Sequence, residues 1–433
     1  MTSPLKIHIF RFQILILSLL KNIISTLFTK GFVAFINLAI LLVSCQQLGS
    51  DIRGQVSLLI FNIAIIQIIN EVYTGYILVY FIPKFSLKKI YTSGLLWAII
   101  CTILCVAVML FLFVFFEVGS IDHWFHLVAL SLLIIIHSFH MVIILAKERI
   151  KIYNFLNFFQ PALLLSVLFV MFFVFHIKTI NSYIIALYVS FSAAIIVSII
   201  QVASIFKNHY NTLTLFEPKR IIENGFYNQL ANLCHMLSNR YNFYLLGNTV
   251  LVGIYSSATS LIESVWIISG SVSPIILTYI ANEKDPANNA KITLFLAKIC
   301  FLLSLLCVVV LYFIPREFFV FLLGQDFIHV KTVMMYLSPG ILFISFATII
   351  SHYFAGLGKQ RILLIANSCG LLTTISVSRY LISKDQLLGA SYSACLSYFV
   401  ATIILVVFFL KENKFSLLDL LRFKKDFELL KRS

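Results

Sequence analysis

The chain has 433 residues, of which 61% are hydrophobic and 11% are charged, and its mean hydropathy is +1.01. No water-soluble domain of this length hides so much apolar surface, so the composition excludes a soluble protein and predicts one embedded in a lipid bilayer. Its net charge of +15 comes from Lys and Arg concentrated in alternate loops, so membrane topology explains the charge and nucleic-acid binding is not indicated.

Twelve apolar stretches are long enough to cross a bilayer as helices, and they are too long and too uniformly apolar for the strands of a barrel. Residues 5–20 are also apolar, but basic residues flank or interrupt them and no small-residue cleavage site follows. We interpret them as a lead-in to the first helix and not as a removable signal peptide. The predicted spans are residues 22–44, 54–82, 91–116, 124–146, 152–175, 182–206, 221–247, 250–282, 291–314, 330–355, 361–382 and 387–410.

Basic residues alternate from one connecting segment to the next, and this alternation predicts the orientation of the chain. Most Lys and Arg lie on the side of the two termini, so we expect both termini to be cytoplasmic. The basic tail, 411–433, mixes Leu with Lys and Arg. It suits either a helix on an anionic inner leaflet or a solvated segment. The opposite loops contain few basic residues, namely Arg53, Lys178, Arg316 and Lys384.

The connection after the sixth span divides the chain into two halves. It contains Pro218 and separates a predicted N-terminal six-helix lobe, 1–210, from a C-terminal six-helix lobe, 211–410. Each half begins with a span that ends in Leu-Gly and is followed by a glycine at the start of the next span. This weak repeat is typical of transporters with duplicated bundles around a central cavity. The predicted fold class is therefore an all-α integral membrane protein.

The seventh span carries a polar stripe, because its polar residues recur every three or four positions. At about 100° per residue they occupy roughly 80° of one helix face. Such a stripe either bonds to neighbouring helices, at about 0.6 kcal/mol per contact, or lines a cavity, and its length favours a cavity. Its members are Asn224, Asn228, Asn232, His235, Asn239 and Asn242.

Other spans also bury polar or charged residues. In the second span Gln67, Asn70 and Glu71 share a face, and Glu263 lies in the eighth. Either acid could carry a coupling proton or form an ion pair with Lys30 or Arg240.

Sequence signatures of catalysis and of metal binding are missing. There is no glycine-rich phosphate loop followed by Lys-Ser or Lys-Thr, and the eight cysteines form no CxxC pair. His137 and His140 share a helix face, and we favour packing over a metal site. The chain is predicted to be neither an enzyme nor a cofactor-binding protein.

Several short motifs occur in the same order as in a known family. The chain resembles the polysaccharide exporters, the Wzx-type flippases of the multidrug/oligosaccharidyl-lipid/polysaccharide superfamily. Asn239 stands where that family often has an acid. The motifs are Leu48-Gly49 with Arg53-Gly54, Asn239-Arg240, Leu246-Gly247, Val252-Gly253-Ile254-Tyr255-Ser256-Ser257-Ala258, Leu323-Gly324-Gln325-Asp326-Phe327, Leu337-Ser338-Pro339-Gly340, Gly356-Leu357-Gly358-Lys359 and Leu387-Leu388-Gly389-Ala390.

The resemblance implies a flippase in the cytoplasmic membrane of a bacterium that moves a polyprenyl-pyrophosphate-linked oligosaccharide for cell-surface polysaccharide synthesis. Membrane lipids and a polysaccharide polymerase are the implied partners. Lys30 and Arg240 would then contact the phosphates, while the polar stripe, Gln67 and Asn70 would contact the sugars. Glu71 and Glu263 would be the coupling acids. The alternatives are an ion-coupled multidrug exporter of the same superfamily, a lipid II flippase, and a non-transporting component of the envelope pathway.

Overall fold

The computed structural model describes residues 4–75, 77–82, 85–116, 123–207, 218–282, 286–416 and 418–419, and every regular element in these ranges is helical. The predicted boundary between the halves, at residues 210 and 211, and most of the basic tail lie outside these ranges. The α-helices are α1 Pro4–Thr74, α2 Leu78–Phe81, α3 Leu87–Phe116, α4 Trp124–Ala146, α5 Ile150–Phe169, α6 Ile180–Lys207, α7 Pro218–Arg240, α8 Asn242–Leu245, α9 Thr249–Glu263, α10 Ile267–Asn282, α11 Pro286–Phe313, α12 Arg316–Leu323, α13 Val330–Gly356 and α14 Gln360–Asn413. A short π-helix, η1 Val170–Val174, and two short 3-10 helices, η2 Ser264–Trp266 and η3 Gln325–Phe327, complete the set.

Nine helices in the described part of the chain are long and apolar enough to cross a membrane. Two of these, α1 and α14, contain kinks with non-helical backbone, at Gly49 and at Asp385 and Gln386. Each kink falls between two predicted spans. The segments on either side of the kinks, together with the polar α7, match the predicted spans, so the all-helical membrane class is confirmed.

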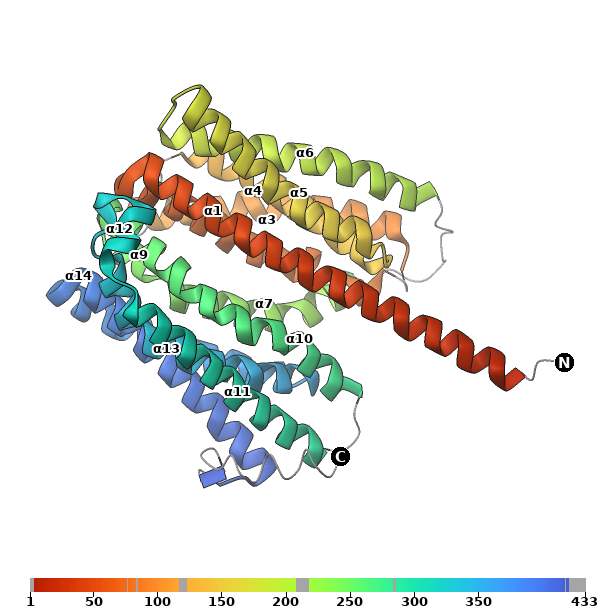
Figure 1. Ribbon diagram of the computed structural model, residues 1–433. Helices are drawn as coiled ribbons and strands as arrows, with labels where there is room; N and C mark the ends of the chain where they lie inside the picture. The colour runs from red at the N-terminus through yellow and green to blue at the C-terminus, as the bar shows by residue number, and fades with distance from the viewer. Residues whose placement is uncertain are drawn as a thin grey trace. The chain divides into compact units, whose positions relative to one another are not determined.

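Contacts between Cα atoms divide the chain into two compact units, which we call the first and the second unit. The first unit contains Met1–Ser44, Tyr73–Ala107 and His123–Ile222. Within it, α4 and α5 both pack against α6, and these three helices lie side by side in Figure 1. Its core includes His140, whose two ring nitrogens form hydrogen bonds with Tyr91 (3.0 Å) and Ser198 (2.8 Å).

The second unit contains Cys45–Val72, Val108–Asp122 and Glu223–Ser433. Its central helix is α13, which packs against α9, α10, α11 and α14. The second half of α1 belongs to this unit as well, so the contacts group the predicted second span with the C-terminal helices. The predicted division into six and six helices stays a prediction.

Two glycines allow α1 and α9 to approach very closely within the second unit. A Cβ atom built on Gly54 would lie 1.8 Å from the carbonyl oxygen of Thr249, and one on Gly253 would lie 1.8 Å from that of Ser50. Real side chains do not tolerate such distances to backbone atoms. Any larger residue would push the two helices apart.

Around Gly49, polar contacts join the kink of α1 to the segment that contains α12 and η3. We call residues Leu48–Asp51 the first kink. The backbone N–H of Ser50 donates to Asp326 (3.2 Å), and Gln46 donates to the carbonyl of Leu322 (2.9 Å). The positive φ of Gly49 (72°) interrupts the helical hydrogen-bond pattern at this point. Asp326 therefore accepts from the N–H of Ser50 in place of a backbone carbonyl.

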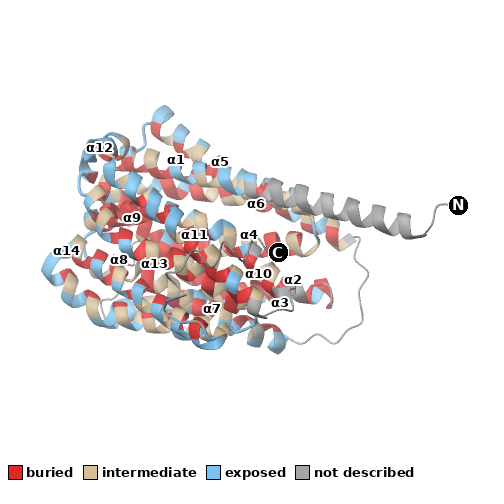
Figure 2. Cartoon of the chain, turned by 60° about the horizontal axis from the view of Figure 1, so that its bottom comes forward, coloured by how far each residue is buried: buried red, intermediate tan, exposed pale blue. Residues whose placement is uncertain are grey.

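Many large apolar side chains are exposed, as a protein that faces lipid requires. In α3 they include Leu96, Ile100, Ile103 and Leu104, which are 50–60% exposed. Figure 2 shows pale blue faces on several helices next to buried faces of the same helices. The apolar surface therefore faces the hydrocarbon, while the polar side chains gather inside the helical units.

Candidate functional site

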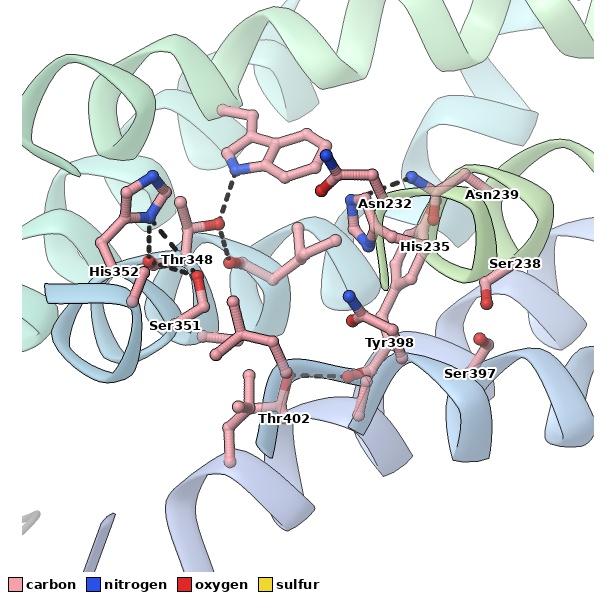
Figure 3. Close-up of a pocket in the computed structure, with 18 of the residues that line it drawn as sticks. Asn232, His235, Ser238, Asn239, Thr348, Ser351, His352, Ser397, Tyr398 and Thr402 are labelled. Atoms are coloured by element: carbon pink, nitrogen blue, oxygen red, sulfur yellow. Dashed lines mark hydrogen bonds between the residues drawn. The ribbon is translucent and has the colours of Figure 1, made fainter. Parts of the chain in front are cut away.

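A cavity of about 440 Å³ lies inside the second unit, between α7, the η2–α10 segment, α13 and α14 (Figure 3). Its volume is typical of a small-molecule site. The lining residues are Asn228, Asn232, His235, Ser238, Asn239, Trp266, Leu277, Ile344, Ala347, Thr348, Ser351, His352, Ala355, Gln360, Leu363, Asn367, Ser397, Tyr398, Ala401, Thr402 and Leu405.

The polar stripe of α7 supplies one wall of this cavity. Asn228, Asn232, His235 and Asn239 all line it, and Figure 3 shows Asn232, His235 and Asn239 on one side of the space. Asn224 lies in the first turns of α7, but its side chain is outside the described part of the structure.

The last member of the stripe, Asn242, has a different environment. The helix is interrupted after Arg240, and Asn242 begins the short helix α8. Its side chain is fully buried, donates to the carbonyl of Ala390 (2.9 Å) and accepts from Ser378 (2.7 Å). The stripe therefore lines a cavity over most of its length and bonds to another helix at its end.

Hydrogen bonds already hold several side chains around the cavity in place. The indole N–H of Trp266 donates to Thr348 (2.7 Å), and its ring meets that of His235 edge to face at 5.4 Å. Nδ1 of His352 lies 2.8 Å from the carbonyl oxygen of Thr348. A carbonyl only accepts, so Nδ1 carries the hydrogen and Nε2 of the neutral ring is an acceptor.

Hydrogen-bond donors around the cavity are mostly engaged by the protein itself. The amide of Asn232 donates to Gln229 (3.1 Å), and that of Asn367 donates to the carbonyl of Ala231 (3.0 Å). Hydroxyls follow the same rule, because Ser351 and Thr402 donate to carbonyls of their own helices at 2.8 and 2.7 Å. Their oxygen lone pairs remain available for a ligand.

Two buried acceptors at the cavity have no donor within the described part of the chain. They are Oδ1 of Asn239 and Oε1 of Gln360. The Asn239 side chain is also buried, with its nitrogen 3.4 Å from Nε2 of His235. An unsatisfied buried acceptor costs free energy, so both oxygens favour a ligand that donates hydrogen bonds.

No carboxylate and no Lys or Arg belongs to the set of residues that line this cavity. An ion pair joins Arg240, the residue after the cavity-lining Asn239 at the end of α7, to Glu263 at the end of α9. Arg240 also lies over the ring of Phe243, with its guanidinium carbon 5.4 Å from the ring centroid. The ion pair that the sequence offered as one alternative is therefore present, and it connects two helices.

The predicted residues of the second span lie outside the cavity. Gln67 donates to Glu71 (3.0 Å), and the buried Asn70 donates to the carbonyl of Ile66 (2.9 Å). Lys30 belongs to the first unit and is exposed. Within the second unit, the structure thus groups the α7 residues of the predicted site around one cavity, which Gln67, Asn70 and Glu71 do not line.

The sequence analysis did not identify the cavity walls formed by α13 and α14, although both helices carry a periodic pattern of small and polar residues. In α13, Thr348, Ser351, His352 and Ala355 follow helical spacing, and α14 repeats the pattern from Tyr398. Small and polar residues at this spacing mark a face that avoids lipid. The same helices bury other hydroxyls in packing contacts, which makes this face less distinct than that of α7.

Arg53 is a second residue whose environment the sequence did not indicate. We expected it in a loop, but its side chain is only 8% exposed, and its Nε and Nη1 have no acceptor within the described residues. A buried guanidinium without an acid is costly.

The helical bundle, its apolar exterior and the polar cavity define a multi-pass membrane protein. No protein-family model matches the sequence, and no curated protein matches it either.

Solved structures show the likeness in fold. A lipid II flippase, MurJ, in an inward closed conformation is 14% identical with a TM-score of 0.70, and the match covers 93% of this chain and 89% of that one. A Vibrio cholerae MATE transporter, VcmN, is 13% identical with a TM-score of 0.63, over 92% of this chain and 97% of that one. An inward-facing multidrug resistance MATE family transporter of the MOP superfamily is 12% identical with a TM-score of 0.64, over 88% and 94%. These proteins are transporters and flippases, not enzymes.

Proposed function

We propose that this protein is a flippase for polyprenyl-pyrophosphate-linked oligosaccharides that serve cell-surface polysaccharide synthesis. The observation that carries the proposal is the amide-rich cavity, lined by no Asp, Glu, Lys or Arg, inside a membrane-spanning bundle. Polar groups within a bilayer are costly unless they meet protein or a polar cavity, so a polar hollow of this size indicates a polar cargo. The fold shared with a lipid II flippase is compatible with a lipid-linked cargo.

An oligosaccharide needs hydrogen bonds, whereas its pyrophosphate needs positive charge. The asparagines of α7 supply the first, with Gln67 and Asn70 as further proposed contacts. Lys30 is the better proposed contact for phosphate, since it is exposed and pairs with no acid in the described structure. Arg240 is already balanced by Glu263, so phosphate binding by Arg240 requires that this pair open. Glu71 and Glu263 remain the proposed coupling acids.

A drug exporter and a lipid II flippase share the fold and are the two rival functions. The cavity argues against an exporter of organic cations, because a desolvated cation needs a nearby negative charge and none lines this space. Lipid II is distinguished only by its sugars and peptide. We further propose an inner-membrane location with cytoplasmic termini and coupling to a polysaccharide polymerase.

The test is reconstitution of the full chain into vesicles with a fluorescent polyprenyl-pyrophosphate oligosaccharide. We expect exchange between leaflets above the rate of protein-free vesicles, and little exchange of lipid II or uptake of tetraphenylphosphonium. Asn228→Leu should slow exchange, whereas Asn181→Leu, at an exposed position of the first unit, should not. Transport of the phosphonium or of lipid II alone would overturn the proposal in favour of that rival.

A further inference from the structure

The cavity of the second unit has a chemistry that narrows its ligand beyond the class of lipid-linked oligosaccharides. From its lining we infer that this cavity is a subsite for an uncharged, hydroxyl-rich sugar unit that packs against Trp266. The inference rests on the proposed function, since it takes the sugar to be part of the transported cargo. Three independent features of the cavity carry it.

First, the cavity offers an excess of acceptors. Oδ1 of Asn239 and Oε1 of Gln360 are buried without donors in the described structure, and Nε2 of His352 is an acceptor because Nδ1 donates to Thr348. The hydroxyls of Ser351 and Thr402 add lone pairs, because their hydrogens are used within their own helices. A ligand that satisfies this site must present several donors, as the hydroxyls of a sugar do.

Second, no Asp, Glu, Lys or Arg lines the cavity, so it offers no counterion for a cationic ligand or for an anionic sugar. A bound ammonium or phosphonium group would lack a counterion, and a uronic acid or a phosphate would lack a Lys or Arg. Both charges of the nearby Arg240–Glu263 pair are already engaged. Neutral polyols avoid the cost of burying a charge.

Third, the cavity contains an aromatic surface held in a fixed pose. Trp266 is the last residue of η2, the 3-10 helix between α9 and α10, and its N–H donates to Thr348. With its polar atom engaged, the indole presents apolar ring surface to the cavity. Such a surface packs against the C–H face of a sugar ring. The volume of about 440 Å³ suits a sugar unit and not a long oligosaccharide, so the rest of the cargo would lie outside it.

The test measures sugar binding to the full-length protein in lipid nanodiscs by saturation-transfer NMR. The probes are methyl glucoside, methyl galactoside, N-acetylglucosamine, glucuronate and tetraphenylphosphonium. We expect at least one neutral sugar to bind with millimolar affinity and glucuronate to bind at least tenfold more weakly. Trp266→Ala and Asn239→Leu should each weaken binding about tenfold, the loss expected for one buried interaction. Trp124→Ala and Asn181→Leu, both at exposed positions of the first unit, should leave it unchanged.

The Asn239→Asp variant is a control that distinguishes a specific loss of sugar binding in Asn239→Leu from misfolding. This variant keeps the shape of the side chain and its acceptor Oδ1 but adds a negative charge, so it should retain neutral-sugar binding and gain affinity for tetraphenylphosphonium. Failure of every neutral sugar to bind the unaltered protein, or tighter binding of the phosphonium to that protein, would overturn the inference.

The outcomes also separate this inference from the proposed function. Sugar binding that Trp266→Ala abolishes, in a protein without leaflet exchange, would refute the flippase and support the sugar site. Unchanged leaflet exchange in Trp266→Ala and Asn239→Leu would refute the sugar site as part of the transport path and support the flippase.

Discussion

Variants of the ion pair between Arg240 and Glu263 test whether these two residues stabilise the fold or take part in transport. The two side chains are only 22% and 17% exposed, and they join α7 to α9. Removal of one partner leaves the other charge buried, at a cost of about 3–5 kcal/mol in comparable pairs. Because some water reaches both groups, we expect Glu263→Met and Arg240→Met each to lower the free energy of unfolding by about 3 kcal/mol.

The double variant should recover most of this loss. Two methionines fill similar volume without charge, and such replacements of buried pairs are often neutral or stabilising. A double-mutant cycle should therefore give a coupling free energy of about 5 kcal/mol, which is the sum of the two single losses less the small loss that remains in the double variant. The assay is equilibrium unfolding in mixed detergent micelles, followed by circular dichroism.

The matched control is the pair formed by Arg316 and Glu317, whose side chains are 67% and 69% exposed and 3.0 Å apart. Arg316→Met should change stability by less than about 1 kcal/mol. Single variants of Arg240 or Glu263 as stable as the unaltered protein, or a double variant as unstable as the sum of both, would refute the reasoning. A stable double variant that still exchanges the proposed lipid-linked oligosaccharide between leaflets would exclude Arg240 as a required phosphate contact.

Three further predictions concern packing and the cavity. Gly253→Ala should lower the melting temperature in a thermal scan, because its Cβ would meet backbone, while Gly270→Ala, with open space at that atom, should not lower it. Asn242→Leu should cost about 1–3 kcal/mol in unfolding, since it leaves buried partners unsatisfied. Asn228→Leu, by contrast, should keep stability and slow leaflet exchange in the vesicle assay. Asp326→Ala should speed amide hydrogen exchange in the first kink, where it accepts a backbone hydrogen bond; unchanged exchange there would contradict this assignment.

The fold class could be predicted from the sequence because lipid imposes a simple rule on every span. Each crossing needs about twenty apolar residues in a helix, and this pattern is visible without any knowledge of tertiary contacts. Even α7, whose polar stripe makes it the least apolar of the long helices, overlaps the predicted span 221–247. The kinks at Gly49 and Gln386 fall where the predicted loops lie.

Pairings between distant residues were harder to predict. The sequence shows that Glu263 and Arg240 lie within spans, but it does not show which helices are neighbours. The sequence therefore allowed either Lys30 or Arg240 as the ion-pair partner of Glu71 and of Glu263. The structure pairs Glu263 with Arg240 and places Gln67 beside Glu71. Partner choice depends on helix packing, which hydropathy does not encode.

The stripe of α7 shows where helical periodicity succeeds and where it fails. Its spacing correctly groups Asn228 through Asn239 on one face, because a regular helix repeats every 3.6 residues. The argument assumes an unbroken helix, however, and α7 ends at Arg240, so Asn242 leaves the face and bonds to Ala390.

The ion pair lies between the asparagines that line the cavity and Asn242, which bonds to another helix. Its Arg240 is the last residue of α7 before the helix is interrupted. On one side of it the asparagines keep acceptors that no donor in the described structure satisfies; on the other, Asn242 has both its amide groups bonded. The pair therefore separates a cavity suited to a removable ligand from a permanent helix contact. A polar residue in a span becomes a candidate binding residue when the protein leaves part of its hydrogen-bonding capacity unused, which is a property of the folded structure and not of the residue type.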